Sequence, residues 1–142
     1  MNGPGHRIST FILFLLIFCL DRINFSLLDH KIIQPSVGLF IGMMISCAGK
    51  PSWNNLLAFS PDIDLNIAHR SFVTHSPLIP FFAYISQPYI HDVVLLSLLD
   101  GFIIGWCFHV VCDGFTAYRS KRVAYICFFS SLAFLLYILF SG

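Results

Sequence analysis

Five long segments of the chain carry almost no charge, and they limit the fold more than any other feature of the sequence. Only the fourth is interrupted, by Asp100 and His109. A helix that crosses a bilayer needs roughly 20 consecutive apolar residues. The sequence therefore predicts an all-α fold, a polytopic membrane helical bundle of about five helices with four to five spans. The segments are Ile8–Leu20, Ile32–Gly49, Pro77–Ile90, Val93–Cys112 and Val123–Gly142.

The composition indicates lipid, rather than water, as the solvent of this chain. Hydrophobic residues make up 57% of the 142 residues and charged residues 11%, whereas soluble domains carry about 25% charged residues. We therefore expect a single membrane-embedded domain over residues 1–142, with membrane lipids as partners. The net charge of +1 gives no indication of nucleic-acid binding, and we interpret the five cysteines as small apolar residues of the helices.

The basic residues predict how the bundle is oriented. If the N-terminus is cytoplasmic and every segment crosses the membrane, six of the eight basic residues lie inside, and only Arg22 and Lys31 lie outside. Cytoplasmic loops of membrane proteins carry such an excess of lysine and arginine. This orientation places the segment 50–76 and the end of the fourth helix on the same, cytoplasmic face. The six inner residues are Arg7, Lys50, Arg70, Arg119, Lys121 and Arg122.

Two short polar stretches stand out against the apolar background. The first, "SPDIDLNIAHRSFVTHSP" at 60–77, holds two of the seven acids and two of the six histidines. An extended "DID" within it would project Asp62 and Asp64 to one side. The second is "GWCFHVVCDGFT" at 105–116, in which Gly105, His109 and Asp113 lie four residues apart. A helix presents these three on one face, where the glycine leaves room for a close neighbour.

The chain just after the first stretch predicts a helix start. Ser76 offers an oxygen to cap free amide groups, and Pro77 suits the first helical position. His75 would then lie at the positive end of the helix dipole, where an anion is favoured.

We interpret the acids and histidines of both stretches as one metal site. Taken singly, the carboxylates would more often cap a loop, and a histidine in a helix is more often packed or hydrogen-bonded. However, an ionised group near mid-bilayer costs about 2.5–3.5 kcal/mol, which mutual pairing or a metal ion offsets. Oxygen and nitrogen donors without thiolate suit zinc, manganese or iron, and we expect zinc first. The expected ligands are Asp62, Asp64, His69, His75, His109 and Asp113.

Together these motifs resemble those of a known family. "PDID" is followed by "HR" and "THS", and then by "GxxxHxxxD" leading into "DGFT". Over residues 60–116 this pattern is similar to that of the membrane-bound metal-dependent hydrolases, also described as LexA-regulated, inner-membrane-associated hydrolases. That family is distantly similar to zinc-dependent phospholipase C. The resemblance implies the inner (cytoplasmic) membrane as the location, the same six ligands, and His6 as a further ligand at the start of the first helix.

The resemblance also implies metal-dependent hydrolysis of a phosphodiester. Asp64 or Asp62 would accept a proton, and Arg70 would hold a phosphate oxygen, beside a cation that polarises the phosphoryl group. A site at headgroup depth implies a phospholipid or a lipid-linked phosphodiester as the substrate.

Two alternative functions stay open. One is a non-enzymatic membrane interaction protein with a structural metal. The other is a metal or ion transporter, for which acids near the bilayer midplane are typical. Only Asp100 fits that position. It lies about 180° around the helix from His109, and it could simply hydrogen-bond a neighbouring helix.

Overall fold

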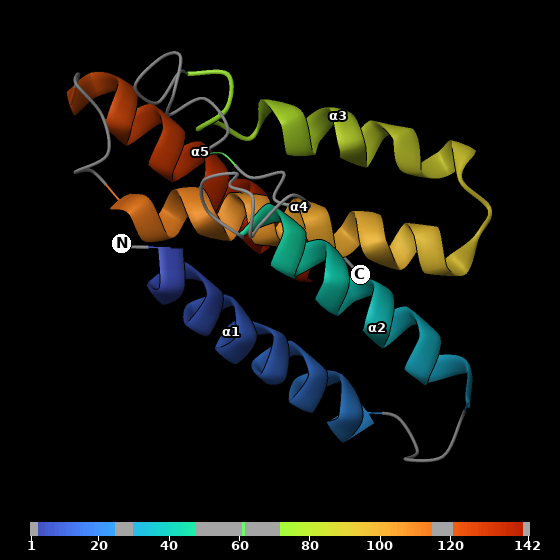
Figure 1. Ribbon diagram of the computed structural model, residues 1–142. Helices are drawn as coiled ribbons and strands as arrows, with labels where there is room; N and C mark the ends of the chain where they lie inside the picture. Colours follow the sequence, from blue (N-terminus) through green and yellow to red (C-terminus); the bar gives the residue numbers. More distant parts are fainter. Residues whose placement is uncertain (1–2, 25–29, 48–60, 62–71, 115–120, 141–142) are drawn as a thin grey trace, which may run out of the picture.

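A computed structural model describes residues 3–24, 30–47, 61, 72–114 and 121–140 of the chain. Within these residues the regular structure is entirely helical, which confirms the all-α prediction for this part of the chain (Figure 1). A short 3₁₀ helix, η2 (Gln87–Tyr89), follows the third α-helix. The α-helices are α1 (Gly3–Asn24), α2 (His30–Ser46), α3 (Leu78–Ser86), α4 (Val93–Asp113) and α5 (Lys121–Phe140).

Among the described residues, two helices are long and apolar enough to cross a membrane, α4 and α5. They have 21 and 20 residues, which at 1.5 Å per residue is about 31 and about 30 Å, close to the thickness of a hydrocarbon core. Shorter apolar stretches lie in α1 and α2, at Arg7–Cys19 and Ser36–Ser46. By length and composition the described residues contain two candidate spans, and the larger number of four to five stays a prediction.

The third predicted segment forms a shorter helix than a full span requires. α3 has nine residues, about 14 Å, or roughly half of a hydrocarbon core. It ends at Ser86, because Pro88 in the following 3₁₀ helix has no N–H group to continue the helical hydrogen bonds. Its start lies one residue later than predicted: the helix begins at Leu78, whose N–H donates to Ser76 Oγ at 3.3 Å.

Local signals fix both ends of α4. Asp92 caps the N-terminus, where its Oδ1 accepts a hydrogen bond from the Leu95 N–H at 2.8 Å. At the C-terminus, Gly114 has a φ of +58°, a backbone conformation that favours glycine and ends the helix. The helix extends one residue beyond the predicted end at Cys112, so that Asp113 belongs to its last turn.

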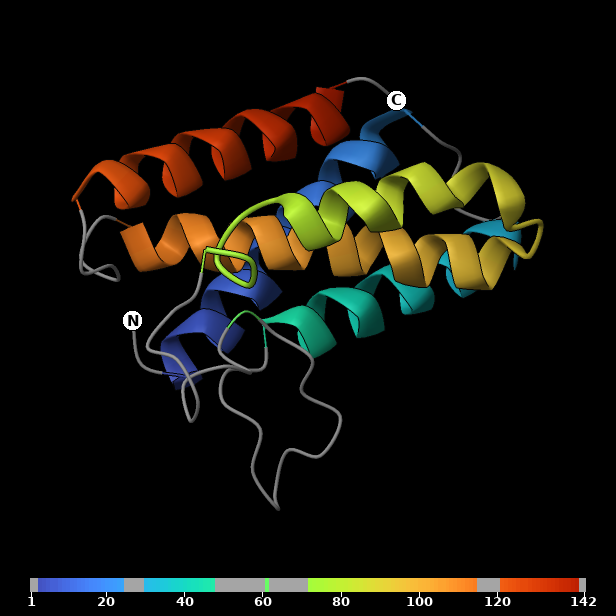
Figure 2. The same cartoon turned by 90° about the horizontal axis from the view of Figure 1, so that it is seen from above.

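α4 is the central helix of the described bundle. It contacts each of the other α-helices, and in Figure 1 it lies between α2 on one side and α3 and α5 on the other. Figure 2 shows α3 and α5 running along it from above. Helix α2 runs parallel to α4, because Gly38 faces Val94 near the start of α4 and Ser46 faces Gly105 nearer its end.

Glycines allow α2 and α4 to approach each other backbone to backbone. A Cβ added at Gly42 would lie 2.0 Å from the Leu98 carbonyl oxygen, and one at Gly101 would lie 2.0 Å from the Leu39 carbonyl oxygen. No side chain fits at either position. Small residues four apart on both helices are typical of helix pairs packed within membranes. The expected close neighbour of Gly105 is therefore α2. The interlocking glycines are Gly38 and Gly42 of α2 and Gly101 and Gly105 of α4.

The described surface is rich in large apolar side chains, while several polar side chains are buried. Phe82 of α3, Phe129 of α5 and Leu16 of α1 are all more than half exposed. Exposed apolar residues occur on every α-helix, and such a surface marks contact with lipid or with other proteins. The buried polar residues are Thr10, Ser46, His75, Ser76, Ser97, His109, Asp113 and Ser131.

Candidate metal centre

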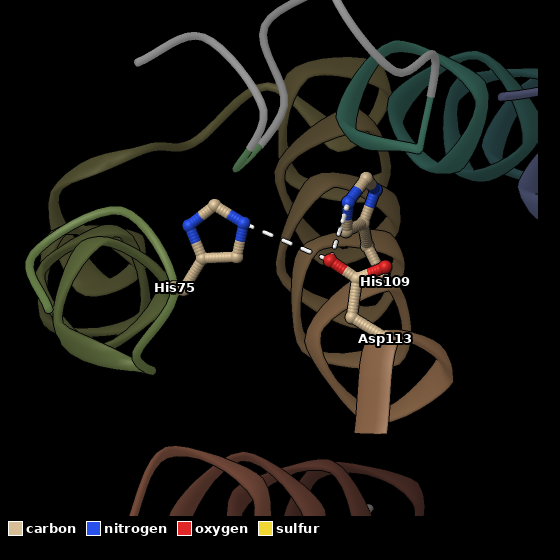
Figure 3. Close-up of side chains that lie close together, drawn as sticks. All are labelled: His75, His109 and Asp113. Atoms are coloured by element: carbon tan, nitrogen blue, oxygen red, sulfur yellow. Dashed lines mark ion pairs between the residues drawn. The ribbon is translucent and has the colours of Figure 1, made fainter. Parts of the chain in front are cut away.

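Three of the predicted ligands converge at one end of the bundle. His75 lies in the turn that precedes α3, and His109 and Asp113 lie on the last turns of α4. The helix places the latter two on one face because they are four residues apart. Figure 3 shows the His75 ring directed across the gap between the two elements towards the Asp113 carboxylate. The structure thus brings together residues separated by more than thirty positions in the sequence.

The carboxylate lies between the two imidazole rings. Asp113 Oδ2 is 3.7 Å from His75 Nε2 and 3.6 Å from His109 Nε2. The ring centroids are 6.4 Å apart, and the ring planes meet at 76°. Both imidazoles therefore direct a nitrogen towards the same oxygen from different sides.

The two nitrogen–oxygen distances are longer than direct hydrogen bonds and leave room for a shared cation. A charge-assisted N–H···O hydrogen bond is about 2.7–2.9 Å long. Two ligand atoms that each lie about 2.1 Å from a tetrahedral zinc ion are about 3.4 Å apart. The two nitrogen–oxygen distances lie close to the second value, and one ligand atom from each of the three residues lies within 4.8 Å of the others.

The type of donor points in the same direction. Two imidazole nitrogens and a carboxylate oxygen form a set that zinc, manganese and iron accept. The side chains are 0% exposed for both histidines and 1% exposed for the aspartate. A buried carboxylate needs a nearby positive charge, because removing it from water is costly. His75, His109 and Asp113 therefore form a buried group that could hold a metal ion, whose identity the geometry does not select.

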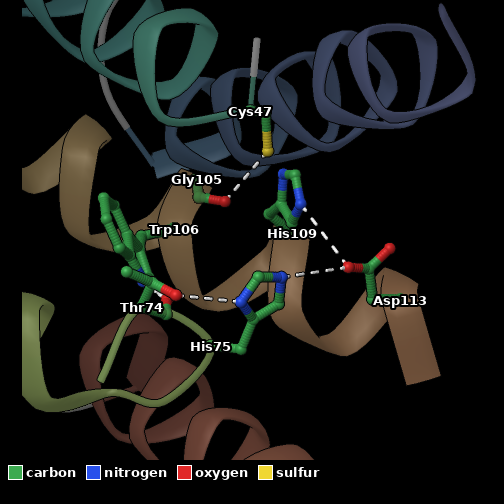
Figure 4. A network of polar contacts seen from close by, with 7 residues as sticks. All are labelled: Cys47, Thr74, His75, Gly105, Trp106, His109 and Asp113. Atoms are coloured by element: carbon green, nitrogen blue, oxygen red, sulfur yellow. Dashed lines mark hydrogen bonds and ion pairs between the residues drawn. The ribbon is translucent and has the colours of Figure 1, made fainter. Parts of the chain in front are cut away.

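One polar contact lies within the His75 turn, and one hydrogen bond connects that turn to the central helix. Thr74 Oγ1 lies 3.0 Å from His75 Nδ1, the ring nitrogen opposite the one that faces Asp113. Trp106 of α4 donates from its indole Nε1–H to the Thr74 carbonyl oxygen at 2.9 Å. Figure 4 shows Trp106, Thr74 and His75 following one another around the site. Sequence reasoning missed both contacts; the one available signal was that a buried tryptophan usually needs a partner for its N–H.

The end of α2 lies on the other side of the site. Cys47 directs its thiol towards the Gly105 carbonyl oxygen, at 2.9 Å, one helical turn before His109 (Figure 4). Sequence reasoning treated this cysteine only as a small apolar residue. Its burial agrees with that view, but the sequence held no signal for its place beside the histidine.

The other predicted site residues are not placed by the structure. Asp62, Asp64, His69 and Arg70 lie outside the described residues. The backbone of His6 belongs to the start of α1, but its side chain lies outside the described part. Their roles as ligands, proton acceptor or phosphate-binding residue stay predictions.

Asp100 lies away from this group and has a different partner. The Gln87 side chain in η2 donates a hydrogen bond from Nε2 to Asp100 Oδ1. The alternative that Asp100 hydrogen-bonds a neighbouring helix is thus the one observed, with the 3₁₀ helix η2 as the partner.

Comparison with known proteins finds no relative of this chain. No protein-family model matches the chain, and neither a curated protein nor a solved structure matches it. What can be said of function therefore depends on the residues and on their geometry.

Proposed function

We propose that the protein is a membrane-embedded, metal-dependent hydrolase that acts on a phospholipid or a lipid-linked phosphodiester at the cytoplasmic face of the membrane. The observation that carries the proposal is the buried group formed by His75, His109 and Asp113. The chain has few charged residues, so a buried group of two imidazoles and a carboxylate needs a specific reason. Binding a catalytic cation is such a reason.

The place of the group along α4 supports a substrate at headgroup depth. Asp113 is the last residue of α4, and His75 comes three residues before α3 begins. If α4 crosses a hydrocarbon core of about 30 Å, its end lies at the boundary with the headgroups. A phosphodiester carried on a lipid would reach that depth without leaving the membrane.

We further propose that α1, α2 and α3 lie in the inner membrane with α4 and α5, with the N-terminus in the cytoplasm. Exposed apolar side chains on all five helices support this arrangement. The parallel direction of α2 and α4 also supports it, because consecutive crossings place every second helix in the same direction. α3 is the exception in length: its nine residues cover about half of a hydrocarbon core, so the residues on either side of it would complete this crossing.

In this proposal His75, His109 and Asp113 hold the cation, with zinc expected first. When bound, a divalent cation polarises a phosphoryl oxygen and makes a water molecule more acidic. The α4 helix fixes the spacing of two of the ligands. Asp62 and Asp64 would accept a proton and bind the cation, and further residues would complete the site: His69 and His6 as ligands, and Arg70 as a two-pronged donor to the phosphate. The sequence resemblance supports these last roles.

Metal content and turnover, measured on the same protein, test the proposal. Detergent-purified wild type should contain at least about one equivalent of a divalent transition metal and should hydrolyse members of a phospholipid panel. His109→Gln should lose both properties. His91→Gln is the matched control, because His91 is exposed just before α4 and lies outside the group. If metal-loaded wild type shows no turnover on a broad panel of phospholipids and lipid-linked phosphates, the hydrolase proposal fails.

A structural metal is the second candidate, and the burial of the group favours it. Closed structural sites are fully enclosed by protein ligands, whereas catalytic sites keep a position open. The three side chains are at most 1% exposed. Metal-dependent stability without turnover would identify this function.

Thiol labelling tests the proposed orientation separately. Lys121 and His91 are exposed and adjoin opposite ends of the bundle, next to the end and the start of α4. In a variant whose native cysteines are replaced, Lys121→Cys should be protected from an impermeant reagent outside intact cells, and His91→Cys should react. Labelling of position 121 from outside would reverse the orientation.

A further inference from the structure

The contact between Thr74 and His75 bears directly on which ring nitrogen is available to a cation. A neutral imidazole carries one proton, so one nitrogen donates and the other accepts. His75 Nε2 faces the Asp113 carboxylate at 3.7 Å, and His75 Nδ1 lies 3.0 Å from Thr74 Oγ1. A cation at Nε2 requires the proton on Nδ1, which then donates to the threonine hydroxyl oxygen.

We infer that Thr74 is a positioning residue of the metal centre: its hydroxyl oxygen accepts the Nδ1–H of His75 and thereby presents Nε2 to the cation. This inference rests on the proposed metal centre. Histidine ligands commonly donate their second ring N–H to a fixed oxygen, which sets the tautomer and the ring orientation. Thr74 supplies such an oxygen from the neighbouring position in the chain.

Trp106 gives this arrangement a fixed base. Its indole N–H donates to the Thr74 carbonyl oxygen at 2.9 Å, and its side chain is fully buried in the core around Val110 and Cys127. α4 thus provides two ligands directly and, one turn earlier, also holds the residue that orients the third. Trp106 thus fixes the backbone of Thr74, whose hydroxyl group contacts the Nδ1 side of the His75 ring.

The same hydroxyl group could act in the opposite sense, and this makes the inference testable. If Thr74 donated its O–H to Nδ1, the proton of the neutral ring would lie on Nε2, and His75 could not bind a cation there. Thr74 would then be a structural residue of the turn. The two roles predict different effects on metal affinity.

The test is a Co²⁺ titration of metal-free protein in detergent, read by the visible absorption of the bound ion and by competition with a chelator. Thr74→Val keeps the shape but removes the oxygen, and it should lower Co²⁺ affinity about 10–100-fold. Thr74→Ser keeps the oxygen and should bind as wild type does. Trp106→Phe should weaken binding less than Thr74→Val. Ser97→Ala, which removes another buried hydroxyl nearer the opposite end of α4, should leave affinity and spectrum unchanged.

The outcomes distinguish a failure of the positioning role from a failure of the metal centre on which it rests. Wild-type affinity and spectrum in Thr74→Val would overturn the positioning role and leave the metal centre intact. Equal weakening in Thr74→Val and Thr74→Ser would assign the effect to packing and would also overturn it. Should Thr74→Val fail to fold, unchanged affinity in Trp106→Phe would overturn it. Absence of Co²⁺ binding by the wild type would overturn the metal centre and the inference together.

Discussion

Two aspartates on the same helix have very different surroundings. Asp100 is partly buried and accepts a hydrogen bond from the neutral amide of Gln87. Asp113, about 20 Å further along α4, is almost completely buried and faces the nitrogens of His75 and His109. Among the described residues, one carboxylate has a neutral amide as its hydrogen-bond partner, whereas the other lies beside two imidazoles that could bind a metal ion with it.

The difference shows what distinguishes a tolerated acid from a candidate ligand. In both places the carboxylate lies on a long apolar helix, so its presence alone carries no function. For the partly buried carboxyl group of Asp100, a hydrogen bond from one amide is sufficient. Convergence of several donors within 4.8 Å indicates a centre that a cation would complete, because ionised groups without a counter-charge are expensive in such surroundings.

The sharpest test applies the same substitution to both aspartates. Asp113→Asn should lower metal affinity by more than about 100-fold, because it removes a direct ligand where even a supporting residue contributes about 10–100-fold. Asp100→Asn should leave affinity near that of the wild type. Competition titration with a chelator measures both variants. Equal losses of metal affinity in the two variants would show that both carboxylates act through the general stability of α4. Asp113 would then not be a metal ligand.

Chelation should reproduce the contrast in thermal stability. At a metal concentration of 100 times the dissociation constant, binding stabilises the folded protein by about 2.7 kcal/mol. A chelator should therefore lower the melting temperature of the wild type and of Asp100→Asn. It should barely affect Asp113→Asn, which holds little metal to lose. Identical shifts in all three proteins would contradict the role of Asp113 as a ligand.

Near Asp100, the contact between α4 and α2 should be sensitive to any added side-chain atom. Gly101→Ala would place a Cβ 2.0 Å from the Leu39 carbonyl oxygen, a backbone atom. Such overpacking costs about 1–3 kcal/mol of unfolding free energy. Gly38→Ala is the milder control, since its Cβ would lie 2.9 Å from its nearest atom. Denaturation in detergent should rank Gly101→Ala as the less stable variant, and a reversed order would contradict the described packing.

Removal of the partner of Asp100 should have the smallest effect. Gln87→Ala deletes one hydrogen bond near the surface of the bundle, and we expect a loss of about 1 kcal/mol of unfolding free energy. Metal content should not change, because the bond lies far from the centre. A loss of metal in this variant would mean that the two regions are coupled, and the comparison would then fail.

The sequence could predict the features that depend on local signals. α4 was expected over Val93–Cys112 from its apolar run and is observed over Val93–Asp113, where a capping aspartate and a terminal glycine lie next to it in the chain. The grouping of His109 with Asp113 follows from helical spacing alone. The approach of His75 was expected from the orientation of the segments.

Features that depend on which surfaces meet could not be predicted. The spacing of Gly101 and Gly105 is compatible with many neighbours, and only the packed structure shows α2 as the partner. The bond from Trp106 to the Thr74 carbonyl joins positions 32 residues apart, and no periodicity of the sequence indicates it. The length of α3 was overestimated because the apolar run continues through Pro88. The helical hydrogen bonds stop before it, since proline has no N–H group.

The division of the three candidate ligands between two elements determines how their arrangement can change. His109 and Asp113 are carried by a single helix, so any motion of α4 moves them as one body and preserves their separation. His75 is carried by a separate turn, which Trp106 ties to α4. The separation of His75 from the other two side chains therefore depends on a contact between two elements and not on one helix. If the three side chains hold an ion, that contact would set which ionic radius they accept.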